Sequence, residues 1–176
     1  MNLKWENMFR TSVLVLLCLS AYGCCHVDSR AVHITLSKDL QDPVQRSTLE
    51  VHIVAVNDSD YNQWKYLNMQ DYWKVDNALR ETTTSSAKTK VLTFGANNTQ
   101  ILLANDGFWD RQDDPLYIFV LSNTPSEGAS QPGNQDPRRR VFPLGKCHWS
   151  GDQAIEIQLT PSGWITLTPP SNWQAP

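Results

Sequence analysis

The chain has 176 residues, a length that suits one domain, and its 15 Lys and Arg against 18 Asp and Glu give a formal net charge of −3. Because there is no excess of positive charge to neutralise phosphates, nucleic acid is not an expected partner. Apolar residues make up 40% of the chain and include seven Trp, a composition that excludes a disordered, collagen-like, coiled-coil or multi-span membrane protein.

Residues 1–23 have the layout of a signal peptide. Lys4 and Arg10 supply positive charge, an apolar run follows over residues 13–19, and small residues lead up to Cys24. The apolar run is too short to span a bilayer. The end of the segment resembles the lipobox of bacterial lipoproteins, in which Cys24 is acylated, with palmitate as one chain, and becomes the mature N-terminus. Ordinary secretion, with Cys24 as a structural cysteine, is the alternative.

The lipoprotein interpretation sets the expected domain organisation. Residues 24–30 form a lipidated tether, 31–170 a single β-sandwich domain and 171–176 a tail. Cys25, and not Asp, follows the acylated cysteine, and the sorting preference of such lipoproteins then points to the outer membrane. The expected location is therefore the periplasmic face of a bacterial outer membrane, with the lipid anchor as the contact to the membrane.

Cys25 and Cys147 are the two cysteines left in the mature chain, because Cys18 leaves with the signal peptide and Cys24 carries the lipid. In an oxidising compartment they can form a disulfide that ties the tether to the domain. Two free thiols are the alternative, and the spacing of the two residues does not decide between these possibilities.

Seven short segments alternate apolar and polar residues, as strands with one buried face do. In the first of them, Val32, Ile34 and Leu36 share one face, and turn-forming pairs such as Asp106-Gly107 separate the segments. The pattern predicts a mainly β fold, an antiparallel β-sandwich of two sheets. The predicted strands are 31–36, 49–56, 89–94, 99–103, 116–121, 154–159 and 163–167.

Two stretches interrupt the strand pattern. Residues 58–81 are rich in aromatic and amide side chains, and Asn68 is a suitable N-cap, so a short helical insert lying over one sheet is predicted. Residues 125–137 form a long surface loop that runs into three consecutive arginines at 138–140. The arginines are either a solvated feature of a sheet edge or a contact for an acidic partner or anionic lipid headgroups.

The sequence carries no motif of a common catalytic or cofactor site. A Gly-rich phosphate loop, paired-Cys zinc spacing, a helical two-His motif and a Gly-x-Ser-x-Gly elbow are all missing. His33 and His52 on neighbouring strands are a weak metal hypothesis, and the aspartates within 106–114 a weak calcium hypothesis. Two outward histidines on a sheet and acidic turn residues are the simpler interpretations. We therefore expect no enzyme activity, no bound metal and no cofactor.

The Trp residues support a different hypothesis about function. Exposed indole rings stack on the apolar faces of sugars, so a glycan- or peptidoglycan-binding envelope lipoprotein is the alternative function. In a small sandwich most Trp instead fill the core. Trp173, in a Pro-rich tail, is the least suited to the core. The residues concerned are Trp64, Trp73, Trp109, Trp149, Trp164 and Trp173.

The order of these elements resembles the TssJ lipoproteins of type VI secretion systems, small outer-membrane-anchored β-sandwiches of transthyretin-like form. The resemblance starts at Cys24 and continues through a strand at 32–36, a polar loop at 37–48 and a strand at 49–56. Asp71-Tyr72-Trp73 is similar to the acidic and aromatic positions of the family's helical insert. The family's usual Asn-Pro-Asp and Gly-Arg-Pro residues are absent from the loop.

The resemblance implies a non-catalytic, lipid-anchored assembly subunit of a type VI secretion-like envelope complex. In the family the first loop docks on the periplasmic domain of the inner-membrane protein TssM, so a TssM-like protein is the implied partner. Carried over by position, the docking residues are Lys38, Asp39, Leu40, Gln41, Asp42, Pro43, Val44, Gln45 and Arg46.

Overall fold

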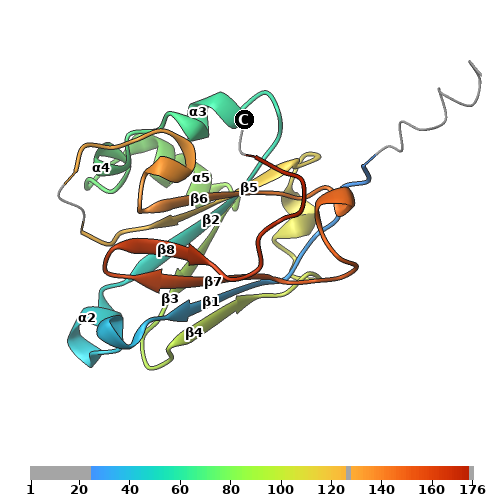
Figure 1. The fold of residues 1–176 in the computed structure, drawn as a ribbon. Helices are drawn as coiled ribbons and strands as arrows, with labels where there is room; N and C mark the ends of the chain where they lie inside the picture. The colour runs from blue at the N-terminus through green and yellow to red at the C-terminus, as the bar shows by residue number, and fades with distance from the viewer. Residues whose placement is uncertain (1–24, 126–127, 175–176) are drawn as a thin grey trace, which may run out of the picture.

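The protein is a β-sandwich in which two four-stranded sheets pack face to face and short helices cover the outer side of one sheet (Figure 1). The structure is a computed structural model that describes residues 25–125 and 128–174. The predicted signal peptide (1–23) and the acylation predicted at Cys24 lie outside the described residues. Within those residues, no helix is long and apolar enough to cross a bilayer. The predicted fold class, a mainly β two-sheet sandwich with a helical insert, is confirmed.

The two sheets draw their strands from the whole chain. One sheet has the order β4-β1-β7-β8 and the other the order β3-β2-β5-β6. The strands are β1 (Val32–Leu36), β2 (Glu50–Val56), β3 (Thr89–Thr93), β4 (Thr99–Leu102), β5 (Tyr117–Ser122), β6 (Arg139–Pro143), β7 (Ile155–Thr160) and β8 (Gly163–Thr166).

Seven of these strands match the seven predicted ones to within one residue at each end. Two features differ from the prediction. β1 and β7 pair in parallel, while all other pairs are antiparallel, because alternation along a strand says nothing about its direction relative to its neighbour. β6 was not predicted, since a run of arginines followed by Val-Phe-Pro lacks the alternation and composition of a strand.

The main core fills the space between the sheets. On β1 and β7 every second residue points inward, so Val32, Ile34, Leu36, Ile155 and Ile157 are almost fully buried. They face the inward residues of the other sheet, and the interdigitated side chains form one continuous cluster. The partners from that sheet include Val51, Ile53, Ile118, Val120 and Phe142.

A second core lies on the outer side of the β3-β2-β5-β6 sheet, under the helical insert. Val54 and Val56 of β2 and Phe119 of β5 point to that side and are buried. This double burial explains why β2 has an uninterrupted apolar run rather than strict alternation. The insert consists of α3 (Tyr61–Lys65), α4 (Met69–Tyr72) and α5 (Ala78–Ser85).

The predicted capping of the insert by Asn68 is present. Its side chain accepts hydrogen bonds from the backbone amides of Gln70 (2.9 Å) and Asp71 (3.2 Å), which starts α4. Asn77 caps α5 in the same way by accepting from the amide of Arg80 (2.9 Å). The insert therefore extends past the predicted boundary at residue 81.

Arg138 and Arg139 are buried, so the prediction of a solvated edge or an external contact is wrong for these two arginines. Arg140 is half-buried and donates to the carbonyl oxygens of Asn134 (2.6 Å) and Trp164 (2.7 Å). Arg138 donates through Nε (3.0 Å) and Nη2 (2.9 Å) to the buried carboxylate of Asp136. Burial acts to raise the pKa of Asp136, but these bonds and the Arg138 backbone amide outweigh it, and the pKa lies below its usual value. The pair fixes the end of the long loop where β6 begins.

Arg139 is fully buried and holds the helical insert to the long loop. Its guanidinium donates to the carbonyl oxygens of Gly133, Trp64 and Leu67, each at 2.9 Å, and also to that of Gln131. Burial lowers its pKa to about 10, so the group stays charged at neutral pH. The four carbonyl dipoles take the place of water around this charge.

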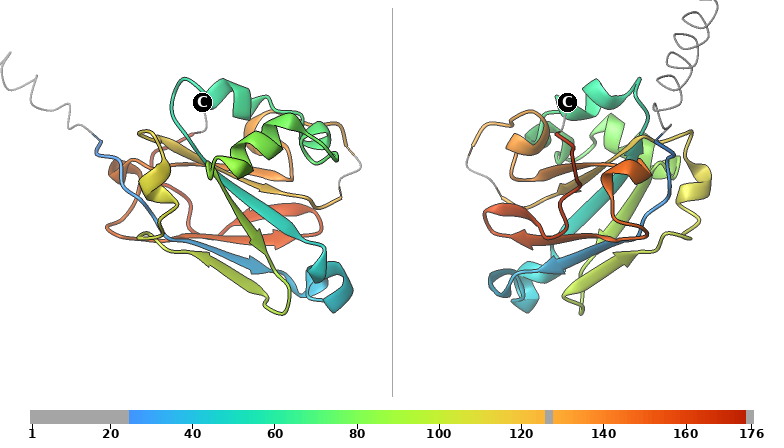
Figure 2. Two further views of the ribbon diagram at one scale, coloured as in Figure 1. Left: turned by 180° about the vertical axis from the view of Figure 1, so that it is seen from behind. Right: turned by 45° about the vertical axis from the view of Figure 1, so that its right-hand side comes forward.

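The sandwich has two ends with different contents (Figure 2). The tether end holds residues 25–31, where the chain enters β1, with the loops 103–116 and 144–154. The first-loop end, at the other end of the strands, holds the first loop at 37–49 and the described parts of the long loop, 123–125 and 128–138. The turns at 94–98 and 161–162 also lie there.

Candidate docking and attachment sites

The first loop is mostly helical rather than irregular. It contains a short 3-10 helix, η1 (Lys38–Leu40), and a one-turn helix, α2 (Pro43–Ser47). Leu40, which the resemblance assigns to docking, is only 7% exposed and packs in the main core. Its side chain anchors the loop in the core and also lines the cavity described below, so the assignment of Leu40 to docking stays a prediction.

Two further predicted docking residues, Gln41 and Arg46, form hydrogen bonds within the protein. Gln41 donates to the backbone carbonyl of Leu36 (3.0 Å). Arg46 donates to the carbonyl of Gly95 (2.7 Å) and to Oδ1 of Asn98 (2.6 Å) in the neighbouring turn. These bonds brace the loop against the end of the sheet and fix the direction in which α2 points.

The exposed residues of the first loop that the structure describes include two short stretches, 38–39 and 42–44. Lys38, Asp39 and Pro43 are exposed, and Val44 is 76% exposed. Asp42 is also exposed, and its carboxylate accepts from the amide of Val44 (3.0 Å) at the first turn of α2. The side chain of Gln45 lies outside what the structure describes.

A cavity of about 330 Å³ lies next to the first loop. Asp39 and Leu49 form one side, and Pro125 and Pro161 come from two other loops of the same end. Three segments far apart in the sequence therefore meet in a small depression with a mixed apolar and polar lining, and one of them is the loop that carries the exposed Val44. An apolar side chain of a binding partner fits such a depression.

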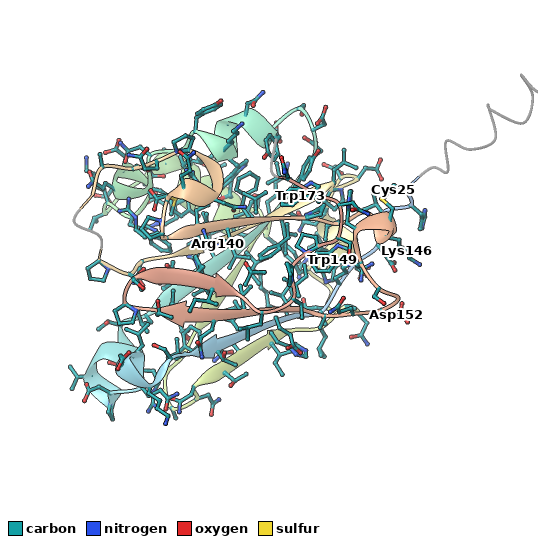
Figure 3. The ribbon with its side chains drawn as sticks, viewed as in Figure 1. Cys25, Arg140, Lys146, Trp149, Asp152 and Trp173 are labelled. Atoms are coloured by element: carbon teal, nitrogen blue, oxygen red, sulfur yellow. A yellow bond between two sulfur atoms is a disulfide. The ribbon has the colours of Figure 1, made fainter. Side chains whose placement is uncertain are left out.

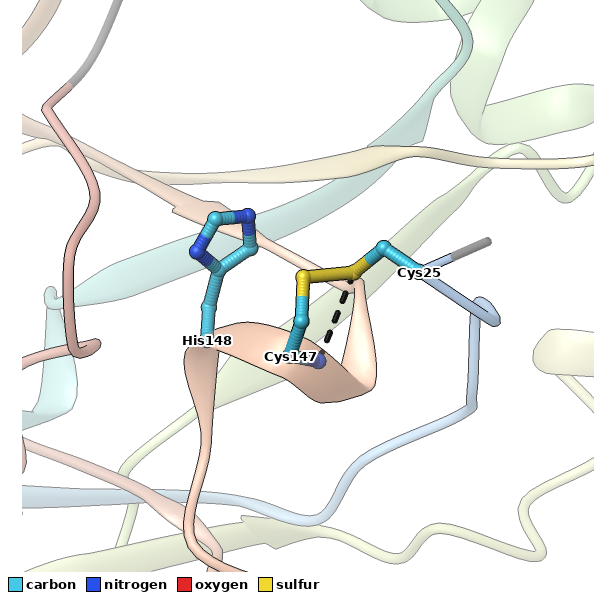
Figure 4. Close-up of side chains that lie close together, drawn as sticks. All are labelled: Cys25, Cys147 and His148. Atoms are coloured by element: carbon cyan, nitrogen blue, oxygen red, sulfur yellow. Dashed lines mark hydrogen bonds between the residues drawn. A yellow bond between two sulfur atoms is a disulfide. The ribbon is translucent and has the colours of Figure 1, made fainter. Parts of the chain in front are cut away.

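The tether end is closed by a disulfide between Cys25 and Cys147, whose Cα atoms lie 5.4 Å apart (Figure 4). Of the two possibilities that the spacing left open, the structure has the two cysteines joined. The amide of Cys147 also donates to Sγ of Cys25 (3.3 Å). Gly145 lies so close to this sulfur that a Cβ at position 145 would overlap it.

Backbone pairing strengthens the attachment on both sides of the disulfide. Val27 and Gly145 form an antiparallel bridge, and the amide of Lys146 donates to the carbonyl of His26 (2.8 Å). Lys146 also pairs with Asp28 through its ammonium group (3.0 Å). Residues 25–30, expected to form a tether, are thus bound to the domain along their length.

Arg30 completes this attachment from inside the domain. Its guanidinium lies over the ring of Trp149, 5.3 Å from the centroid, and donates to the carbonyls of Gly151 (3.2 Å) and Gln153 (3.1 Å). Figure 3 shows Trp149, Lys146 and Asp152 on the same side of the molecule as Cys25. Burial lowers the pKa of Arg30, while Asp28 and Asp152 act against that shift.

Among the described residues, the aspartates within 106–114 do not bring three possible metal ligands together. His33 lies on the outer side of β1, and His52 lies on β2 in the other sheet, so the prediction of neighbouring strands is wrong. The ligand atoms of Cys25, Cys147 and His148 come within 4.8 Å of one another, but the two sulfurs are bonded in the disulfide and offer no thiolate (Figure 4).

His52 is buried, contrary to the expectation of an outward histidine. Its Nδ1 lies 2.7 Å from the hydroxyl of Tyr72, and its Nε2 lies 2.5 Å from a carboxylate oxygen of Glu50. The ring also packs against Trp73. Burial lowers the pKa of His52 in spite of the opposing effect of Glu50. The network joins the helical insert to β2, a structural role.

The described Trp residues pack rather than form a platform. Trp64, Trp149 and Trp164 are buried, and the other three are partly buried against the two cores. Trp173 contacts the second core, although the Pro-rich tail favoured an exposed position. The predicted preference for core Trp agrees with these positions, while glycan binding remains an untested hypothesis.

The architecture defines a small two-sheet sandwich with a bound N-terminal segment at one end and structured loops at the other. No family model matches the chain, and no curated protein sequence is similar to it. Solved structures do match: one described as "Type VI membrane complex" superposes with a TM-score of 0.53 at 11% identity, over 81% of this chain and 99% of that chain.

Another matching structure is described as "T6SS protein TssM C-terminal domain (869-1107) from EAEC", with a TM-score of 0.51 at 12% identity, over 78% of this chain and 99% of that one. The structure of Serratia marcescens Lip, described as a membrane bound component of the type VI secretion system, has a TM-score of 0.45 at 11% identity, over 81% and 98%. At such identities the likeness is one of fold, and the fold is TssJ-like, as the order of elements predicted.

Sequence reasoning missed the features that depend on partners distant in the chain. The buried Arg139, the buried His52 and the cavity at the first-loop end all join segments that are 20 or more residues apart in the chain. One signal was available for Arg138: Asp136 stands two residues before it, and an Asp-x-Arg pair in a long loop is a reasonable local ion pair.

Proposed function

We propose that this protein is a non-catalytic, lipid-anchored subunit of a type VI secretion-like envelope complex. The observation that carries the proposal is the TssJ-like sandwich, whose bound N-terminal segment and exposed first loop lie at opposite ends. Acylation at Cys24 holds the protein at the periplasmic face of the outer membrane. The first-loop end binds the periplasmic domain of a TssM-like inner-membrane protein.

The composition of the first-loop end suits reversible protein contact. Lys38 and Asp39 give it mixed charge, and Val44 offers an exposed apolar anchor on the loop that lines one side of the cavity. Because Leu40 and Arg46 hold the loop from below, the surface is ordered before binding, and less conformational entropy is lost on association.

The docking part of the proposal is tested with Val44→Asp, which places a charge in the centre of the proposed contact. The domain beginning at Cys25 serves as bait for the purified periplasmic domain of the TssM-like protein from the same cells. Binding falls at least about tenfold, since a buried unpaired charge costs more than about 1.4 kcal/mol. Because Val44 is exposed, the free energy of unfolding stays within about 0.5 kcal/mol.

Val75→Asp is the matched control. Val75 is 83% exposed and lies in the helical insert, away from the first loop. The control variant binds the partner as tightly as the wild type. Equal binding by Val44→Asp and wild type, or equal loss in the two variants, contradicts docking through the first loop.

The attachment part is tested by Cys24→Ser in the full chain. The wild type is recovered in the outer-membrane fraction and incorporates labelled palmitate, and the variant does neither. Retention of Cys24→Ser in the membrane fraction contradicts lipid anchoring at this residue. Cys25 is left unchanged, so the disulfide to Cys147 is kept and serves as a check on folding.

A further inference from the structure

The disulfide changes the mechanical link between the proposed lipid and the domain. Cys24 and Cys25 are neighbours, so their Cα atoms are about 3.8 Å apart across one peptide unit. Cys25 is fixed to Cys147, and the following residues pair with 144–146. The free leash between lipid and folded protein is therefore one residue rather than the seven expected for a tether.

Apolar side chains lie near the point where this leash begins: Leu103 and Leu116 are exposed, and Trp109 is partly buried between the surface and the main core. Leu103, directly after β4, is 56% exposed, and its carbonyl accepts from Nε1 of Trp109 (3.0 Å). Trp109 and Leu116 line a groove of about 540 Å³ together with Cys25 and Val27. Trp and Leu beside a lipid attachment point are the side chains that favour the interface of a bilayer.

We propose that the tether end is a membrane-seating face and that the disulfide sets the orientation of the domain on the bilayer. Leu103, Trp109 and Leu116 rest on the lipid surface, and the first-loop end points into the periplasm. The inference rests on the proposed acylation of Cys24. The two ends are separated by at least the length of β2, roughly 20 Å for its seven residues.

The charge at the tether end identifies the lipid surface that it fits. Asp28 is paired with Lys146 and Asp106 with Lys90 (2.7 Å), while Asp110 is exposed close to Trp109. Carboxylates at this end disfavour a strongly anionic surface. The seating face therefore fits a zwitterionic phospholipid surface, with the apolar residues supplying the attraction.

The test uses the full lipidated protein in vesicles of zwitterionic phosphatidylcholine that contain a small fraction of headgroup-labelled acceptor lipid. A donor dye is attached through a keto-bearing amino acid placed at Asp110, on the tether end, or at Val44, on the first-loop end. Energy transfer falls with distance, and the two dye positions lie roughly 20 Å apart along the sandwich. In the wild type, the transfer efficiency from position 110 is therefore at least about twice that from position 44.

The matched variant has ten Gly and Ser residues inserted between Cys24 and Cys25. The insertion keeps the disulfide, the fold and the lipid, but it gives the leash a root-mean-square reach of roughly 17 Å. The ratio of the two transfers then falls to about one. A wild-type ratio of one, or a ratio that the insertion leaves unchanged, overturns the inference.

The lipid contact is tested separately with Leu103→Ser and its control Ile165→Ser, a residue of similar exposure on the open face of β8. Leu103→Ser lowers the ratio and Ile165→Ser does not; equal ratios in the two variants overturn the contact. Mass spectrometry first checks that Cys24 is acylated. An unmodified Cys24 refutes the proposed function, whereas an acylated protein with a ratio of one refutes the orientation alone.

Discussion

The two ends of the sandwich are stabilised in different ways. At the tether end a covalent bond, a backbone bridge and the Asp28–Lys146 ion pair hold a segment that the sequence pattern assigned to a flexible leash. At the first-loop end, loops are held from beneath by Leu40 and Arg46 while their tips stay exposed.

In the proposed function, this difference separates attachment to the membrane from recognition of a partner within one small domain. An end that must resist force and fix direction has bonds that span the sequence, since Cys25 and Cys147 are 122 residues apart. An end that must bind a partner needs an ordered backbone with unoccupied side chains at the surface. The strands between the two ends hold them at a fixed distance and orientation.

The largest expected effect on the free energy of unfolding comes from breaking the buried Asp136–Arg138 ion pair, which supports the first-loop end. Asp136→Asn leaves Arg138 buried without its carboxylate, and we expect a loss of about 3–5 kcal/mol in the free energy of unfolding. Urea denaturation followed by Trp fluorescence measures it. Asp110→Asn, at an exposed aspartate, is the control and changes stability by less than about 0.5 kcal/mol. Equal stability in the two variants contradicts a supporting role for the pair.

The next effect tests the tether end. Replacing Cys25 and Cys147 together by Ser removes the disulfide without leaving a free thiol, and the free energy of unfolding falls by about 2–4 kcal/mol. Reduction of the wild type with a thiol reagent gives a similar loss. In hydrogen exchange, the amides of Asp28 and Lys146 become faster while those of the first loop do not change. Faster exchange at both ends alike refutes the independence of the two ends.

A smaller effect depends on pH and concerns the insert that lies between the two ends. Burial lowers the pKa of His52, so the unfolded chain binds a proton more readily than the native protein. Stability is therefore complete above about pH 6.5 and falls as the pH drops from there towards the native pKa, with a slope of at most about 1.4 kcal/mol per pH unit.

His52→Gln removes this pH dependence, and His33→Gln, at a histidine on the outer side of β1, is the control that keeps it. Urea denaturation at pH 7.5, 6.5 and 5.5 measures the slope for each protein. A slope that survives in His52→Gln shows that another group is responsible.

The sequence predicted the part of the fold that follows from local pattern. Alternation located seven strands, and the amide of Asn68 marked a helix start, because both signals act over a few neighbouring residues. β6 was missed since the charge of its buried Arg139 is satisfied by the carbonyls of Trp64 and Leu67, more than seventy residues earlier. When the groups that stabilise a buried charge lie far away in the chain, the residues around the charge do not reveal that it is buried.

The candidate sites were predicted less completely than the strands. The position of the first loop followed from chain order, but the division of its residues into anchors and contacts depends on packing: Leu40 faces the core, whereas Val44 faces solvent. The bound state of residues 25–30 was not predictable either, because the Asp28–Lys146 pair and the Val27–Gly145 bridge require the whole sandwich to be folded first.

The smallest expected effect on stability comes from a variant that loosens the first loop but leaves its exposed residues unchanged. Arg46→Ala removes the bonds to Gly95 and Asn98, and we expect a loss of about 1 kcal/mol in the free energy of unfolding. Because Val44 remains, partner contact is still possible, but the loop must be ordered on binding and affinity falls by less than in Val44→Asp. Isothermal titration calorimetry separates the two causes, since the Arg46 variant binds with a larger entropic penalty. An Arg46→Ala protein that binds like the wild type indicates that the rigidity of the first loop does not contribute to docking.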